Sequence, residues 1–158
     1  MPFLIALYAV AIISANLLVA KFGPSITPIN AFFLIGLDLA LRNYLALKMS
    51  KIQMAAMIVG TGVISYAVNP ATGMIAIASG VAFTLAALAD WATFNTVSGQ
   101  WMKRNLAGNS AGALVDSIVF PTIAFGSLMP AIVLAQFVAK VAGGAFFGYI
   151  IQRRIQSN

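Results

Sequence analysis

Four charged side chains fall inside strongly apolar stretches of this sequence. Asp38, Asp116 and Lys140 lie near the middle of such stretches, and Arg42 follows Asp38 by one helical turn. A charged side chain at the centre of a bilayer costs about 2.5–3.5 kcal/mol on insertion scales, so each charge must be paired, solvated or bound to a ligand. Because a carboxylate accepts paired N–H donors from the edge of a flat heterocycle, these residues indicate a polar cavity for a hydrogen-bonding small molecule.

The composition places these charges in a membrane protein. The chain has 158 residues, of which 61% are hydrophobic and 8% are charged, and its mean hydropathy is +0.97. A soluble domain is about half apolar and about a quarter charged. Each membrane-spanning helix needs about 20 apolar residues, so the length allows six spans with short connections and no soluble domain.

The residue types that the chain lacks exclude several kinds of chemistry. It contains no Cys, His or Glu, which excludes disulfides, thiolate and imidazole catalysis, and the usual zinc or haem ligation. Neither a catalytic motif nor a filter-like loop is evident, so we expect neither an enzyme nor an ion channel, and no cofactor or metal. The net charge of +6 is attributed to the cytoplasmic excess of Lys and Arg rather than to nucleic-acid binding.

Turn signals divide the chain into six predicted spans of one transmembrane domain, residues 1–158. Gly and Pro residues end the first span in the loop Lys21–Pro28, and Asn69-Pro70 separates the third span from the fourth. We therefore expect an all-α integral membrane protein with six transmembrane helices and short loops. The spans lie at about 2–20, 29–48, 52–68, 71–89, 109–125 and 131–151.

The basic residues predict the orientation of these spans. With both termini in the cytoplasm, Lys21 is the one loop cation outside, and the opposite topology reverses that count. The positive-inside rule therefore predicts an N-in, C-in topology. The basic residues that this places inside are Lys48, Lys51, Lys103, Arg104, Arg153 and Arg154.

The intramembrane charges also have purely structural interpretations. Asp38 and Arg42 share a helix face, which is typical of an ion pair directed towards the inner interface. Asp116 and Lys140 lie at similar depth on neighbouring antiparallel spans, so one buried salt bridge would fix the packing of the last two spans. Both interpretations are compatible with a substrate cavity, because such a pair can form one wall of it.

Other polar residues have similar alternatives. We expect Asp90, near the inner interface, to be a rim carboxylate that pairs with Lys103 or Arg104. Asn16 and Asn109 could form interhelical hydrogen bonds. The small-residue pairs Ala11-x-x-x-Ala15 and Gly144-x-x-x-Gly148 permit close helix contact, either within the protein or with a partner.

One pattern stands out in the second half of the chain: Arg104-Asn105-Leu106 followed by Asp116-Ser117-x-x-Phe120. Further segments with recognisable patterns are 16–18 with 21–23, 32–34 leading to Asp38, 64–66, 90–95 and Lys140. Together these motifs resemble those of the vitamin-uptake-like family of bacterial queuosine-precursor transporters, and the first of them is the most specific. The sequence departs from the family at Arg42-Asn43, where relatives carry an acid, and at Ala113, where many carry a polar side chain.

The resemblance implies a six-span importer of 7-cyano-7-deazaguanine or a related 7-deazapurine in the bacterial inner membrane. Asp38 or Asp116 would accept the N–H groups of the base, with Lys140 orienting or neutralising Asp116. Asn16 and Asn109 would bond other edges, and Tyr66 and nearby Phe residues would stack on the ring. The predicted substrate-binding residues are Asn16, Phe33, Asp38, Tyr66, Asp90, Asn109, Asp116 and Lys140.

Two other functions fit the same sequence. The first is the substrate-binding component of an energy-coupling-factor vitamin importer, for which Ala11-x-x-x-Ala15 is a candidate docking face. The second is a structural or pore-forming membrane protein that transports no vitamin. The expected partners are therefore a small-molecule substrate and the lipid bilayer, while a homo-oligomer or an ATPase module stays open.

Overall fold

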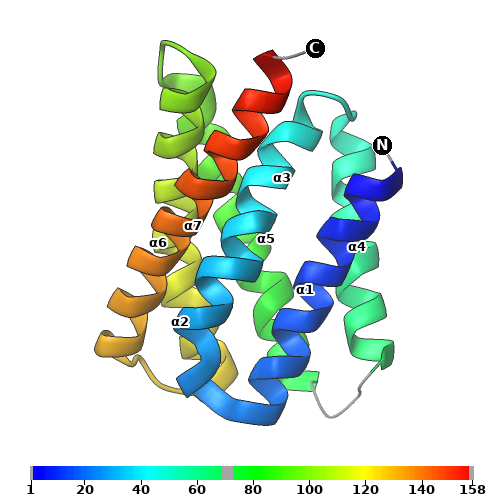
Figure 1. The fold of residues 1–158 in the computed structure, drawn as a ribbon. Coiled ribbons are helices and arrows are strands. Elements are labelled where there is room, and N and C mark those ends of the chain that lie inside the picture. The colour runs from blue at the N-terminus through cyan, green and yellow to red at the C-terminus, as the bar shows by residue number, and fades with distance from the viewer. Residues whose placement is uncertain (1, 69–72, 157–158) are drawn as a thin grey trace.

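The computed structural model describes residues 2–68 and 73–156, and these residues are helical almost throughout (Figure 1). No strand occurs among them. The long helices are α1 (Pro2–Phe22), α3 (Gly36–Ala46), α4 (Lys51–Val68), α5 (Gly73–Thr96), α6 (Trp101–Phe125) and α7 (Pro130–Gln156). Between α1 and α3 lie the 3₁₀ turn η1 (Gly23–Ile26), the short helix α2 (Thr27–Asn30) and the π-helical turn η2 (Ala31–Ile35).

The predicted break after the first span is a tight helical reversal. Gly23 has a φ of 69°, a left-handed conformation that glycine adopts without steric cost. The hydroxyl of Ser25 donates to the carbonyl of Phe22 at 3.1 Å, and that of Thr27 donates to the carbonyl of Pro24 at 2.6 Å. The chain thus turns back without losing local hydrogen bonding, and α1 lies antiparallel to the α2–α3 segment (Figure 1).

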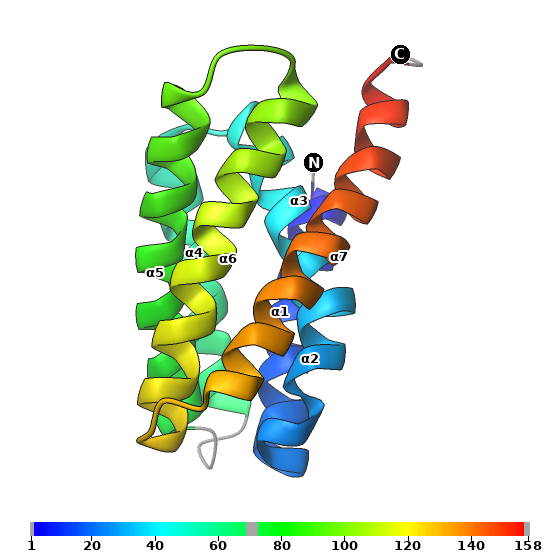
Figure 2. The ribbon, with the colours of Figure 1, turned by 90° about the vertical axis from the view of Figure 1, so that its left-hand side faces the viewer.

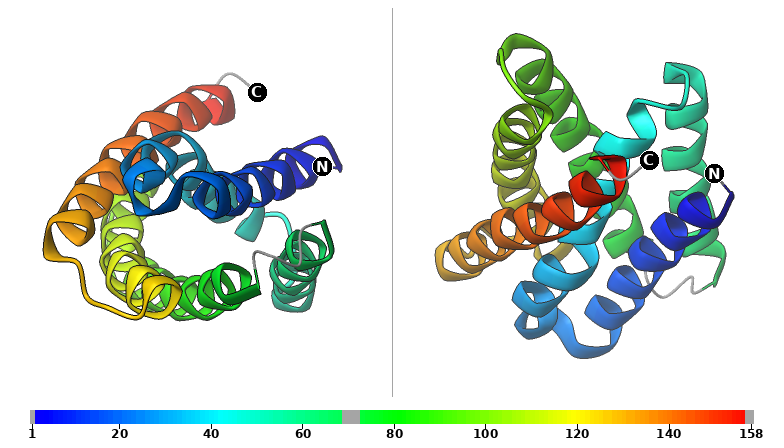
Figure 3. Two further views of the ribbon diagram at one scale, coloured as in Figure 1. Left: turned by 90° about the horizontal axis from the view of Figure 1, so that it is seen from below. Right: turned by 45° about the horizontal axis from the view of Figure 1, so that its top comes forward.

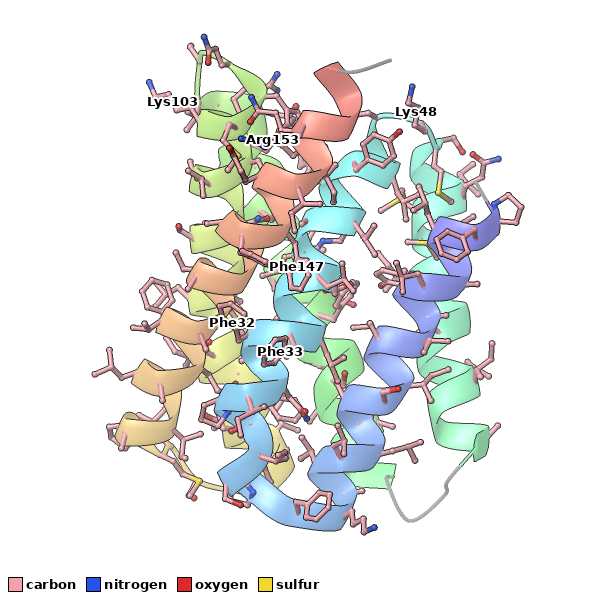
Figure 4. All side chains as sticks on the ribbon, in the orientation of Figure 1. Phe32, Phe33, Lys48, Lys103, Phe147 and Arg153 are labelled. Carbon is pink, nitrogen blue, oxygen red and sulfur yellow. The ribbon has the colours of Figure 1, made fainter. Side chains whose placement is uncertain are left out.

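The helical segments form a closed ring. Contacts join neighbours in the order α1, α4, α5, α6, α7, α3 and back to α1, as the view from below shows (Figure 3). Long segments that follow one another along the chain run in opposite directions, so both chain ends lie at the same end of the bundle (Figure 1). Lys48, Lys103 and Arg153 lie at that end too (Figure 4), an arrangement that suits the predicted orientation, which stays a prediction.

The distribution of polarity is the reverse of that in a soluble protein. Asp38, Asn105 and Lys140 are at most 2% exposed, whereas Val59 and Leu134 are more than 60% exposed. By length and composition, three stretches among the described residues could cross a membrane, namely Pro2–Ala46, Gly73–Thr96 and Pro130–Arg153. The first contains the reversal and therefore both arms of the α1 to α3 hairpin. These features describe a multi-pass membrane protein, and the full count of six spans stays a prediction.

Two predicted boundaries are wrong in the same region. The fourth span was expected to end near residue 89 and the fifth to begin near residue 109, but α5 continues to Thr96 and α6 begins at Trp101. The polar residues there favour helix because they have partners: Arg104 donates from Nε to the carbonyl of Phe94 at 2.9 Å, and its guanidinium lies over the Phe94 ring. The turn expected at Asn69-Pro70 lies outside the described residues.

The small-residue pairs mediate contacts within this chain. Ala11 and Ala15 are 3% and 4% exposed, so the described bundle itself covers the surface proposed for docking an ATPase module. On α7, Gly144 and Gly148 lie against the side-chain amides of Asn109 and Asn105. A Cβ at either glycine would crowd an amide nitrogen, at 3.0 Å and 2.7 Å respectively.

Candidate functional site

A buried cavity of about 40 Å³ lies inside the ring. Its lining comes from α1, the α2–α3 segment, α5, α6 and α7, and α4 contributes no described side chain. Polar groups enter it from three sides: Asn16 on α1, Asp38 on α3, and Gln136 and Lys140 on α7. Phe83 and Phe120 add apolar aromatic surface. One small space thus combines hydrogen-bonding groups with rings that can pack on a flat ligand.

Asp38 is the unpartnered charge of this cavity. It is 1% exposed, and neither carboxylate oxygen has a hydrogen-bond partner among the described residues. The ion pair predicted between Asp38 and Arg42 is wrong, because the Arg42 guanidinium turns towards α5 and pairs with Asp90 at 3.1 Å. A buried carboxylate without hydrogen bonds is unfavourable, so a ligand that donates hydrogen bonds to Asp38 would stabilise it.

The residues that carry Asp38 approach it through a widened helical turn. The π-helical η2 (Ala31–Ile35) directly precedes α3, and such turns are frequent at functional sites. Gly36 then packs against the backbone of Gly143 and Gly144, with approach distances from 2.7 Å for a Cβ placed there. Helix α3 is therefore held close to α7, with Asp38 within one turn of this contact.

Lys140 is fully occupied by protein groups. Its Nζ lies 2.6 Å from Oδ2 of Asp116, which confirms the predicted salt bridge. The same Nζ donates to Ser117 Oγ at 3.1 Å and to Gln136 Oε1 at 2.8 Å. Since an ammonium group has three donors, these three contacts use all of them. Lys140 therefore joins α6 to α7 and sets the positions of Asp116 and Gln136 on the cavity wall.

A second group of buried residues, the polar cluster, consists of Arg42, Asn43, Asp90, Asn105 and Asn109. The Nδ2 of Asn43 donates to Asn109 Oδ1 at 2.8 Å and to Asn105 Oδ1 at 3.0 Å, and lies 3.4 Å from Asp90 Oδ1. Arg42 pairs with Asp90, as described above, and its guanidinium lies 4.7 Å from the centre of the Phe83 ring. The cluster thus connects α3, α5 and α6.

The polar cluster corrects the expectation for Asp90. This carboxylate does not pair with Lys103 or Arg104 at the rim, because it is 2% exposed and bound to Arg42. Gly108 on α6 makes the burial feasible: a Cβ at this position would collide with Asp90 Oδ1. A wider pocket of about 690 Å³ lies on the far side, and it shares Arg42 with the central cavity.

The predicted site residues therefore divide into three groups. Asn16, Asp38, Asp116 and Lys140 line the central cavity. Asp90 and Asn109 belong to the polar cluster. The predicted ring-stacking residue Phe33 lies elsewhere: it is 57% exposed and its ring packs against Phe32 (Figure 4). Tyr66 belongs to α4, and its side chain is outside the described part, so its predicted role stays a prediction.

Sequence reasoning missed several lining residues. Gln136, Thr27 and Asn30 line the cavity, and all three are 4% exposed or less. Gln136 precedes Lys140 by one helical turn, and this shared face was the available signal. Asn30 donates from Nδ2 to the carbonyl of Ala15 at 3.1 Å, so it ties the two arms of the first hairpin together.

The cavity is too small for a bicyclic ligand in this conformation. A water molecule needs roughly 10–15 Å³ of such volume, so about 40 Å³ accommodates a few waters. Sites for drug-sized ligands typically span about 300–1,000 Å³. The helices around the cavity must therefore separate before a bicyclic molecule enters. The side view shows that α7 packs diagonally across the bundle next to α6 (Figure 2).

Comparison with known proteins gives one match. A family model described as "putative vitamin uptake transporter" matches residues 3–152, nearly the whole chain. This confirms the family resemblance found in the motifs. The searches of curated proteins and of solved structures found no match.

Proposed function

Since this chain belongs to the vitamin-uptake transporter family, we propose that it imports a queuosine precursor or related 7-deazaguanine base across the bacterial inner membrane. The observation that carries the proposal is the Asp38 carboxylate, which is buried in the central cavity and has no hydrogen-bond partner for either oxygen in the described part of the chain. The amino group and adjacent ring N–H of a guanine-like base supply two parallel donors. A carboxylate is the group that accepts such a pair.

The other cavity groups support the same ligand class. Phe83 and Phe120 provide apolar ring surface of the kind on which a flat base packs. Asn16, on α1, lines the same cavity. The charge of Lys140 is balanced by Asp116 at 2.6 Å and that of Arg42 by Asp90 at 3.1 Å, so both cations among the described lining residues are already paired with a carboxylate. A neutral heterocycle with several N–H groups suits this balance.

Uptake measurements test the proposal. The chain is expressed in bacteria that lack their own importer and their own synthesis of the precursor, and labelled 7-cyano-7-deazaguanine uptake and queuosine in transfer RNA are measured. We expect the wild-type chain to restore both. Asp38→Asn should lower uptake at least ~10-fold, because it replaces one of two acceptors with a donor.

The matched control is Phe33→Leu, which changes an exposed aromatic residue outside the cavity. We expect it to retain uptake at wild-type abundance in the membrane. Wild-type uptake by Asp38→Asn, at equal abundance, would contradict the role of the carboxylate. Failure of the wild-type chain to restore queuosine would contradict the proposed substrate.

A further inference from the structure

Besides Asp38, two buried side chains that line the cavity have a donor without a partner among the described residues: Arg42 at Nη1, whose charge is paired with Asp90, and the neutral Gln136 at Nε2. Gln136 lies on α7, is 2% exposed and lines the central cavity. Its Oε1 accepts from Lys140 Nζ at 2.8 Å, but its Nε2 has no partner among the described residues. A buried amide donor without a partner is as unfavourable as an unpaired acceptor.

The contact with Lys140 fixes which end of the amide is presented. An ammonium group only donates hydrogen bonds, so the Gln136 atom that faces Lys140 must be the oxygen. The NH₂ group then points away from Lys140. Lys140 cannot turn aside, because Asp116 and Ser117 hold its other two hydrogens. Lys140 is thus a positioning residue for the Gln136 donor.

Asp38 and Gln136 offer opposite hydrogen-bonding character in one small space. They come from α3 and α7, which are held together at Gly36 and Gly143, and both line the same cavity of about 40 Å³. Asp38 presents two acceptors and Gln136 presents a donor. Their complement is a ligand edge on which N–H donors lie beside an acceptor.

We infer that Gln136 is a specificity-determining residue, which donates from Nε2 to a carbonyl oxygen of the substrate while Asp38 accepts from the neighbouring N–H groups. The recognised feature is a lactam edge, such as that of a 2-amino-4-oxopyrimidine ring. This inference rests on the proposed function. It adds that the protein recognises the lactam edge of the base and that Gln136 supplies the hydrogen-bond donor. Neither the composition nor the family resemblance singles out Gln136.

Competition uptake with three unlabelled bases tests the inference without any mutation. The first is the parent 7-deazaguanine base, the second carries a thiocarbonyl sulfur, a weak acceptor, in place of the carbonyl oxygen and keeps the ring N–H, and the third lacks the exocyclic amino group. We expect the wild-type chain to bind the second and third bases about 10-fold or more weakly than the parent, because each leaves one buried protein group unpaired or weakly paired. Equal competition by the first and second bases overturns the inference.

Variants then assign the discrimination to Gln136. Gln136→Leu should compete equally with the parent base and the thiocarbonyl base, while still rejecting the base without the amino group. Lys140→Met should weaken the same carbonyl discrimination, because the freed amide can turn its oxygen towards the cavity. A uniform loss of affinity for all three bases in both variants overturns the inference and indicates a structural role.

One further variant guards against misfolding. Gln136→Glu keeps an oxygen for Lys140 and has nearly the same shape, but it presents an acceptor to the cavity instead of a donor. We expect it to lose the preference for the carbonyl base over the thiocarbonyl base, and a retained preference for the carbonyl overturns the inference. If the wild-type chain takes up none of these bases, the proposed function fails and the inference fails with it; uptake without discrimination overturns the inference alone.

Discussion

The central cavity and the polar cluster bury similar side chains to different effect. In the polar cluster, Asp90 pairs with Arg42 and Asn43 Nδ2 bonds to the oxygens of both Asn105 and Asn109. In the cavity, Asp38 is equally buried but makes no hydrogen bond among the described residues. Burying an unpaired charge costs several kcal/mol, in contrast to a well-bonded pair. Three donors of the polar cluster also lack a partner among the described residues, namely Arg42 Nη1, Asn105 Nδ2 and Asn109 Nδ2. The difference is therefore in the charges: Arg42 and Asp90 neutralise each other at 3.1 Å, whereas neither oxygen of Asp38 has a hydrogen-bond partner. We infer that the ion pair of the cluster supports the fold and that Asp38 is available to a ligand.

Both groups are built on the same helix. Asp38 and Arg42 lie one turn apart on α3 and both line the central cavity, yet Arg42 also reaches Asp90 on α5 while Asp38 has no hydrogen-bond partner among the described residues. The Arg42 side chain also borders the wider pocket beyond. The Arg42–Asp90 pair therefore lies between the central cavity and the wider pocket. Asp38, on the cavity side, is the proposed ligand-binding group, and the ion pair supports the fold.

The largest effect is expected from breaking the polar cluster. Arg42→Ala leaves Asp90 buried at 2% exposure without its cation, which should lower the free energy of unfolding by about 3–5 kcal/mol. The thermal midpoint of the purified protein in detergent measures the loss. The matched control is the double variant Arg42→Met with Asp90→Leu, which removes both charges and should be closer to wild type. If the single and double variants are equally unstable, lost packing rather than an unpaired charge is the cause.

A smaller effect is expected from Gly108. Alanine at this position would push its Cβ into Asp90 Oδ1, and such overpacking costs about 1–3 kcal/mol. Gly80 on α5 is the control, because nothing lies within 4 Å of a Cβ built there. Gly80→Ala should be neutral or stabilising, since alanine has the higher helix propensity. Equal thermal midpoints for the two variants would show that α6 shifts to accommodate the methyl group.

Hydropathy and turn chemistry are sufficient to predict the helices and one ion pair. The reversal after α1 follows from Gly23 and Pro24, whose backbone preferences act locally. The Asp116–Lys140 pair follows from equal depth on two helices joined by a short turn. Neither prediction requires knowing how helices that are distant in sequence are rotated about their axes relative to one another.

That rotation is what the sequence leaves open. Arg42 has a carboxylate four residues before it and another 48 residues later, and the structure selects the distant one. The choice depends on the π-helical turn η2, which changes the register of α3, and on the space that Gly108 leaves for Asp90. Gln136 was missed for a related reason: one neutral amide in an apolar span has no distinctive pattern until Asp38 is known to face the same cavity.

The smallest change in stability is expected at Asp38, and it is tested by making the same substitution at two carboxylates. Asp90→Asn leaves the buried Arg42 guanidinium without its anion and should cost about 3–5 kcal/mol, as the loss of either partner of a buried ion pair does. Asp38→Asn replaces an unpartnered buried charge with a neutral amide, so its unfolding free energy should be unchanged or higher by about 1 kcal/mol. At about 2–4 °C per kcal/mol, thermal midpoints in detergent resolve the two variants. A stable Asp38→Asn that no longer transports assigns this carboxylate to the ligand, whereas equal destabilisation of both variants would mean that Asp38, too, supports the fold.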